Sequence, residues 1–125
     1  MIALDTTALI DLFRHDEPLI VLLKETKGPL AIPMLVLLEL QMPHRLDTEE
    51  QALYDQMASR LRLLELTPLA CKMAGALHRQ LLKKGTVLSG FDIAIAASML
   101  AHGVNTIISR DKHFDAIPGL KRIGY

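Results

Sequence analysis

The first segment of the chain, MIALDTTALIDL (residues 1–12), decides the fold. Residues 1–4 are an apolar run of the length of a short buried strand. The polar residues 5–7 are of types that cap helix N-termini, and apolar side chains then recur at helical spacing through Leu12 and Phe13. The segment therefore predicts a buried strand that passes through Asp5 directly into a helix.

The rest of the chain repeats this alternation of short strands and helices. We expect strands at residues 1–4, 30–32, 63–66, 105–108 and 120–123, and helices at about residues 6–13, 17–26, 34–41, 47–62, 68–84 and 89–102. This order predicts one α/β domain over residues 1–125, with a mostly parallel sheet of about four or five strands covered by helices on both faces. Ligands of such sheets bind beyond the carboxyl ends of the strands.

The composition favours a compact domain and shows no direct sign of a nucleic-acid partner. Of 125 residues, 50% are hydrophobic and 22% are charged, and the net charge is zero. Nucleic-acid binders usually carry excess positive charge, so a local patch or a bound metal ion would have to supply it. The single cysteine excludes an internal disulfide. With no signal-peptide pattern and no unbroken apolar segment of about 18 residues, we expect a cytoplasmic protein.

Three carboxylates are isolated in apolar surroundings. Each is the only charged side chain of its segment: Asp5 in residues 1–10, Glu39 in residues 28–43 and Asp92 in residues 89–101. Burying an unpaired carboxylate is costly or forces its protonation, so a compensating partner is expected. A fourth acid, Asp111, comes soon after a predicted strand, as Asp5 does, and both belong at the carboxyl-terminal edge of the sheet.

Each acid also has an ordinary structural explanation. Asp5 could be only a helix N-cap, Glu39 could lie on the exposed edge of its helix, and Asp111 could be a turn residue. Asp92 is harder to explain in this way, because Ser89 is the better cap for its helix.

Together the four acids indicate one acidic pocket. Neighbouring carboxylates cannot all be ionised without a counter-charge, and a hard divalent cation such as Mg²⁺, held by carboxylates and waters, supplies one. Such a metal can activate water and stabilise a phosphoryl transition state. The pocket therefore predicts metal-dependent hydrolysis of phosphodiester bonds.

Four segments of the chain carry a resemblance to a known family. They are residues 4–12 (LDTTALIDL), the pair Glu39–Leu40 after an apolar run, residues 91–97 (FDIAIAA) and residues 109–114 (SRDKHF), with IPGL at residues 117–120 after the last. In this order they resemble the four motifs of PIN domains, and most of all those of VapC-type toxins. The resemblance implies an α/β/α sandwich, a Mg²⁺- or Mn²⁺-dependent endoribonuclease, an inhibitory VapB-type antitoxin and a homodimer.

The resemblance also assigns residues to the site. Asp5, Glu39, Asp92 and Asp111 would be both the catalytic and the metal-binding acids. The hydroxyl of Thr6 or Thr7 matches the family position after the first acid, and that of Ser109 the position two before the fourth. Two features depart from the family pattern: no Ser or Thr lies at residues 34–38 before the Glu, and no Pro lies at residues 87–90 before the third acid. Neither departure removes an acid.

Several basic residues could support RNA binding. Arg14, Arg110 and Lys112 could contact phosphates, since such contacts need only local positive charge, although solvated surface positions are the simpler explanation. The five histidines show no metal-ligand spacing and are expected at surface or helix-end positions.

Two further acids lie close in sequence to the predicted site. Asp11 is six residues beyond Asp5, so a regular helix turns it away from the pocket, and we expect a solvated or capping role. Asp115, four residues beyond Asp111, could join the site, although a surface role is favoured.

Three other classes of protein share part of this pattern. A receiver-like regulatory domain needs paired acids after the first strand, but Thr6 follows Asp5. A phosphatase of the HAD type needs Asp-x-Asp there, but residue 7 is Thr. A non-catalytic α/β protein-interaction domain stays an alternative, because a fold does not guarantee its chemistry. The presence of all four acids favours the enzyme.

Overall fold

Five short strands form one sheet at the centre of the computed structural model, which describes residues 1–125. The strand order is β3-β2-β1-β4-β5, and every neighbouring pair is parallel. The elements are β1 (Ile2–Leu4), α1 (Thr6–Phe13), α2 (Glu17–Glu25), β2 (Leu30–Pro33), α3 (Met34–Gln41), α4 (Thr48–Arg60), β3 (Arg62–Leu64), α5 (Pro68–Lys83), α6 (Gly90–Ala101), β4 (Thr106–Ile108), the 3₁₀ helix η1 (Lys112–Ala116) and β5 (Lys121–Ile123). The predicted α/β fold is confirmed, and its sheet is parallel throughout.

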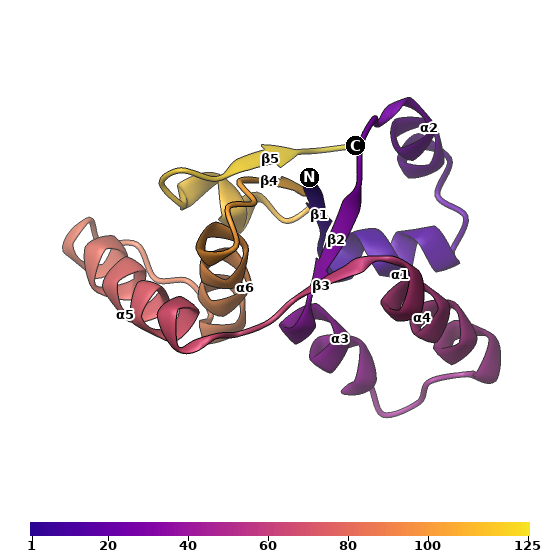
Figure 1. The fold of residues 1–125 in the computed structure, drawn as a ribbon, viewed down its shortest axis with the longest axis horizontal. Helices are drawn as coiled ribbons and strands as arrows, with labels where there is room; N and C mark the ends of the chain where they lie inside the picture. Colours follow the sequence, from indigo (N-terminus) through magenta and orange to yellow (C-terminus); the bar gives the residue numbers. More distant parts are fainter.

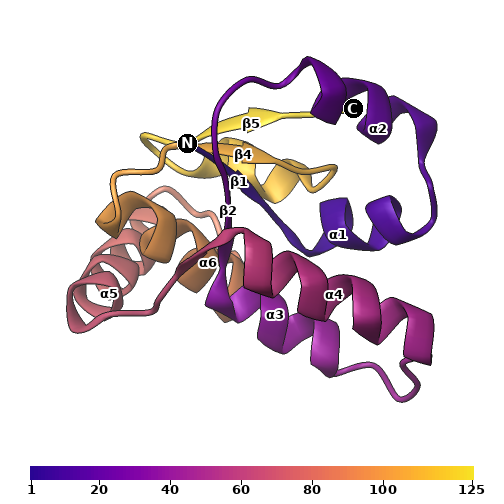
Figure 2. The same cartoon turned by 45° about the vertical axis from the view of Figure 1, so that its right-hand side comes forward.

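Helices cover both faces of the sheet. Figure 1 shows α5 and α6 on one side of the strands and α1, α2 and α4 on the other, and the turned view in Figure 2 keeps the same separation. Helix α3 follows β2 directly and contacts both α1 and α6, so it lies where the two helical layers meet. This is the α/β/α sandwich that the family resemblance implies.

The sequence explains these elements locally. The central strands are buried, as the fully covered Ala3, Ile32 and Ile107 show, because a parallel sheet is packed on both faces. Capping side chains start the helices: Thr67 accepts a hydrogen bond from Ala70 N at the start of α5. No helix of the structure combines the length and the apolar composition that a membrane crossing requires.

Two details differ from the sequence prediction. Strand β3 ends at Leu64 rather than Leu66, because Thr67 N bonds to Glu65 O and turns the chain toward α5. The 3₁₀ helix η1 was not expected. It forms because Asp111 caps its first turn and Phe114 turns inward to become almost completely buried, a contact that depends on the tertiary fold.

Candidate active site

The predicted acids gather at the carboxyl-terminal edge of the sheet. Asp5 directly follows β1 and caps α1, and Asp111 lies beyond β4 and caps η1. Asp92 lies in the first turn of α6, and Glu39 lies on α3, which follows β2. Because parallel strands all end at one edge of the sheet, the segments that follow them place these carboxylates in the same region.

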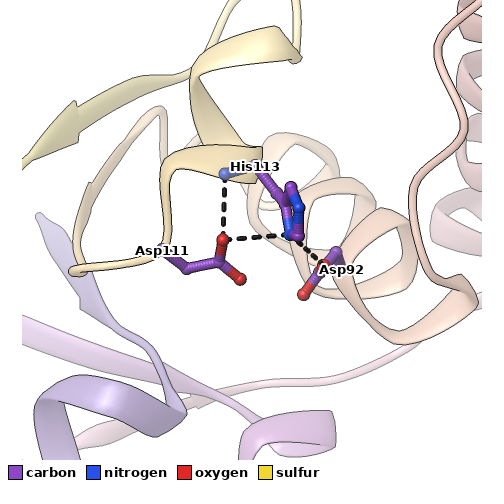
Figure 3. A group of neighbouring side chains, drawn as sticks. All are labelled: Asp92, Asp111 and His113. Atoms are coloured by element: carbon purple, nitrogen blue, oxygen red, sulfur yellow. Dashed lines mark hydrogen bonds and ion pairs between the residues drawn. The ribbon is translucent and has the colours of Figure 1, made fainter.

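A cluster of three side chains forms the exposed part of this region. Single ligand atoms of Asp92, Asp111 and His113 lie within 4.8 Å of one another. His113 Nδ1 is 3.1 Å from Asp111 Oδ1 and 3.6 Å from Asp92 Oδ2. Figure 3 shows the imidazole reaching from η1 toward the carboxylate on α6. The arrangement offers a set of oxygen donors and one nitrogen donor to a cation.

Sequence reasoning missed the place of His113 in this cluster. Its side chain is 67% exposed, which fits the expected surface position, yet it contacts two of the acids. The available signal was its position two residues beyond the capping Asp111. There the backbone N–H of His113 donates to Asp111 Oδ1 at 2.9 Å, which holds the histidine beside that acid.

Asp5 forms the buried part of the site. It is only 3% exposed and accepts hydrogen bonds from Ala8 N at 2.9 Å, from Thr7 Oγ1 at 2.8 Å and from Ser109 Oγ. Burial raises the pKa of Asp5 to about 6, although these hydrogen bonds oppose the change, and the charge of Asp111 raises it further. A nearby cation would stabilise the ionised form of Asp5.

Ser109 joins Asp5 to Asp111. Its hydroxyl, fully buried, donates to Asp5 Oδ2 and accepts from Asp111 N at 2.8 Å. Thr7 adds a second link, because its Oγ1 donates to Asp5 and accepts from Arg110 N at 3.2 Å. The residues after β1 and after β4 are therefore connected by two hydroxyl groups.

Glu39 joins the group through Thr6. The Thr6 hydroxyl donates to Glu39 Oε1 at 2.8 Å, which holds this carboxylate beside the residue that follows Asp5. The sequence left open whether Thr6 or Thr7 supports the site. In the structure both hydroxyls bond to acids, Thr7 to Asp5 and Thr6 to Glu39.

Asp92 is held at the start of an apolar helix. Ser89 Oγ accepts the Asp92 backbone N–H at 3.1 Å, so Ser89 is the cap of α6, as the sequence predicted. Burial raises the pKa of Asp92, and the nearby charge of Asp111 contributes in the same direction. Asp92 is thus a second acid whose ionisation a cation would favour.

The expectation for Asp11 was wrong. Asp11 is neither solvated nor a cap: it is 3% exposed, because Arg110 Nε lies 2.7 Å from its Oδ2 and Tyr125 donates to the same oxygen. Arg110, a proposed phosphate contact, is therefore already paired. Asp115 lies outside the acidic pocket, since both of its oxygens accept from Arg122, at 2.8 and 3.1 Å.

The other two predicted RNA contacts lie on the surface. Lys112 is exposed at the start of η1, directly after Asp111, and Arg14 is exposed where α1 ends. Neither forms an ion pair with an acid in the structure. Both are therefore free to meet a negatively charged ligand.

Comparison with known proteins decides the family. A model of the PIN domain matches residues 2–120. The chain belongs to the PIN domain family. A search of curated protein sequences finds no match. The family and the strand order both rule out the receiver alternative, since receivers arrange their sheet as 2-1-3-4-5.

Solved structures with this PIN fold include several toxin–antitoxin complexes. VapBC2 from Rickettsia felis, bound to a DNA fragment from its promoter, has a TM-score of 0.84 and 24% identity, covering 100% of this chain and 99% of that chain. DNA-bound VapBC from Salmonella typhimurium has a TM-score of 0.83 and 23% identity, with 98% and 96% covered. Mycobacterium tuberculosis VapC20, described as a Sarcin-Ricin loop cleaving toxin, has a TM-score of 0.65 and 16% identity, with 93% and 94% covered. At these identities the likeness establishes the fold.

Proposed function

We propose that this PIN domain is a metal-dependent endoribonuclease and the toxin component of a VapBC-type toxin–antitoxin system. The observation that carries the proposal is the linkage of Asp5, Asp92 and Asp111 at the carboxyl-terminal edge of a PIN-domain sheet. Two of these acids have raised pKa values because they are buried near a third. Such a group of carboxylates is the usual setting for a bound cation.

The donor chemistry of the pocket fits a hard divalent metal ion. Carboxylate oxygens suit Mg²⁺ and Mn²⁺, and we assign the ion to Asp5, Asp92, Glu39 and Asp111, which would also be the catalytic acids. His113 Nδ1 is a further donor within reach of two of them. When bound, the ion would activate a water molecule and neutralise negative charge on the scissile phosphate.

The hydroxyl groups around the acids orient them. Thr7 and Ser109 each donate to a different oxygen of Asp5, so this carboxylate is held in one orientation. Thr6 does the same for one oxygen of Glu39. Such supporting hydrogen bonds fix ligand geometry, and their removal from metal sites typically weakens metal affinity or activity by about 10- to 100-fold.

RNA is the substrate class that we propose. The fold resembles that of VapC20, a Sarcin-Ricin loop cleaving toxin, and exposed Lys112 adjoins Asp111 at the site. Phosphate contacts from Lys112 and Arg14 would position the RNA without reading its sequence. Because the net charge is zero, binding would depend on these local charges and on the metal ion.

The proposed protein partner is a VapB-type antitoxin. Several solved structures with this fold are VapBC complexes, and this chain exposes large apolar side chains on and near α3, among them Met34, Leu38 and Leu66. These three side chains line a surface groove. We infer that an amphipathic segment of the antitoxin lies along this groove and places an Arg or Lys near the carboxylates. We also expect a homodimer and a cytoplasmic location. Absence of a complex after co-expression with a VapB-type protein encoded beside this gene would remove support for the toxin assignment.

The direct test of the enzymatic proposal is a cleavage assay with purified protein. Single-stranded and looped RNA should be cut with Mg²⁺ or Mn²⁺, DNA of the same sequence should stay intact, and EDTA should stop the reaction. Restoring the divalent ion should restore cleavage. RNA cleavage that continues in EDTA would contradict metal dependence, and the absence of cleavage with every divalent ion would favour a non-catalytic interaction domain.

A further inference from the structure

Asp11 is a buried carboxylate that the acidic pocket does not use. Of the 14 Asp and Glu residues, only Asp5 and Asp11 are buried. A buried carboxylate is retained when specific partners compensate the loss of water. The partners of Asp11 therefore indicate what it does.

Asp11 connects α1 to two segments from the other end of the chain. Arg110 Nε lies 2.7 Å from Asp11 Oδ2, and an Arg110 terminal nitrogen donates to Oδ1 at 3.1 Å. The Tyr125 hydroxyl donates to Oδ2 at 2.5 Å. Burial and the neighbouring Asp11 charge both raise the pKa of Tyr125, so its hydroxyl keeps the proton that it donates.

Arg110 is the residue that this carboxylate holds in place. It lies between Ser109, which bonds to Asp5, and Asp111, which faces Asp92 and His113. Its side chain pairs with Asp11, while its backbone N–H donates to Thr7 Oγ1 at 3.2 Å. A planar guanidinium held through two nitrogens fixes direction as well as distance. Arg110 therefore attaches the segment that carries Asp111 to α1 in two ways, through its side chain to Asp11 and through its backbone N–H to Thr7.

We propose that Asp11, acting through Arg110, is a positioning residue that aligns Asp111 with Asp5 for metal binding. The inference rests on the proposed function of the acidic pocket. Asp11 touches neither metal nor RNA in this scheme. Arg110 is committed to Asp11 and does not serve as an RNA contact.

Four variants and one control test this inference in the full-length protein. Asp11→Asn keeps the shape of the side chain but removes its charge, Arg110→Met keeps much of the arginine's length, and the double variant combines both. Tyr125→Phe removes the hydroxyl that donates to Asp11 and leaves both charges of the pair in place, so it is the second variant if Asp11→Asn does not fold. Tyr54→Phe is the matched control, because Tyr54 also donates to a carboxylate, that of Glu50 on α4, and neither residue forms a hydrogen bond or ion pair with the four acids of the pocket.

The measurements separate positioning from RNA contact. We expect Asp11→Asn and Arg110→Met each to weaken Mn²⁺ binding about tenfold or more, measured by electron paramagnetic resonance. The rate constant kcat should fall by a similar factor with KM nearly unchanged, and the double variant should be no worse than the poorer single variant. Exchange of the Asp111 amide hydrogen, which bonds to Ser109 Oγ, should become faster. Tyr125→Phe should show smaller effects of the same sign, and Tyr54→Phe should show none.

Other outcomes overturn the inference. Unchanged Mn²⁺ affinity and Asp111 amide exchange in both Asp11→Asn and Tyr125→Phe would mean that the pair only stabilises the fold. A raised KM and a weaker salt dependence for Arg110→Met, with Mn²⁺ affinity intact, would make Arg110 a phosphate contact. If the parent protein binds Mn²⁺ but cuts no RNA, the proposed function fails while the affinity and exchange data still decide the role of Asp11.

Discussion

At the scale of single residues, the acidic pocket opposes folding when no cation is present. Asp5 is buried, and its pKa is raised from 3.8 to about 6. A difference of this size corresponds to about 3 kcal/mol of unfavourable free energy for the ionised group. Because the folded protein holds this proton more tightly than the unfolded chain, the destabilisation is absent below about pH 4, develops as the pH rises from about 4 to about 6 and is complete above it.

Asp5→Asn should therefore stabilise the metal-free protein at neutral pH. The asparagine oxygen can still accept from Ala8 N, while the unfavourable charge is gone. Urea unfolding at pH 7.5 and at pH 4 measures the effect, and we expect the variant to be more stable than the parent at pH 7.5 with the gain nearly lost at pH 4. A variant that is less stable at pH 7.5 would show that the hydrogen bonds to the ionised carboxylate outweigh its burial.

Asp92→Asn is expected to act in the same direction. Burial and the charge of Asp111 raise the pKa of Asp92, and its side chain is less buried than that of Asp5. Thermal melts without metal should show an equal or higher melting temperature than the parent. A large loss of stability would assign Asp92 a structural role instead.

The role of a residue was predictable from the sequence only where it depends on neighbours along the chain. The isolation of Asp5, Glu39 and Asp92 in apolar segments is visible along the chain. The burial of Asp11 is not, because its partner Arg110 is 99 residues away. Helical spacing suggested that Asp11 turns away from Asp5, yet the Arg110 that pairs with Asp11 also donates its backbone N–H to Thr7, which bonds to Asp5.

At the scale of elements, Ser109 connects the ends of two neighbouring strands. It follows β4 directly, and its hydroxyl bonds both to Asp5 after β1 and to the backbone of Asp111 before η1. The strands bring these residues near one another, and the hydroxyl then fixes their separation. The separation of Asp5 from Asp111 thus depends on this buried hydroxyl, together with the second link through Thr7.

Ser109→Ala should destabilise the protein by about 1–3 kcal/mol, because a buried donor and a buried acceptor each lose their partner. Ser98→Ala is the matched control, since Ser98 is also buried but its hydroxyl has no hydrogen-bond partner. Removing that hydroxyl should change stability by less than about 0.5 kcal/mol or increase it. Urea denaturation compares the two, and equal losses would show that Ser109 contributes packing rather than hydrogen bonds.

The elements themselves were largely predictable. Strands β1, β2 and β4 are apolar runs, and α2, α5 and α6 begin at residues whose side chains cap them. The sequence did not predict the 3₁₀ helix η1, because this helix depends on the packing of Phe114 into the core. That contact requires the assembled sheet and leaves no periodic signal in a five-residue segment.

At the scale of the whole molecule, the interactions that stabilise the fold differ from those that stabilise the ionised pocket. The PIN sandwich is held by apolar burial, whereas the carboxylates at its edge are best satisfied with a cation bound. A ligand that binds only the folded state stabilises it. Metal binding and stability should therefore be linked.

Adding Mn²⁺ or Mg²⁺ should raise the melting temperature of the parent protein. An excess of about 100-fold over the dissociation constant corresponds to about 2.7 kcal/mol of added stability. Asp92→Ala should show little or no increase in differential scanning fluorimetry, although its metal-free stability is retained. An equal increase for parent and variant would place the metal elsewhere on the molecule.

The central claim is that the acids of one pocket hold the metal with which this chain cuts RNA. The most direct measurement is the RNA cleavage rate of purified parent, Asp5→Ala, Asp92→Ala, Glu39→Ala and Asp111→Ala proteins in one assay with Mn²⁺. We expect Asp5→Ala and Asp92→Ala to abolish cleavage, and Glu39→Ala and Asp111→Ala to weaken it, since the latter two would act largely through waters. Undiminished cleavage by Asp5→Ala or Asp92→Ala protein would contradict the account, because the activity would then belong to a contaminating nuclease or to another site.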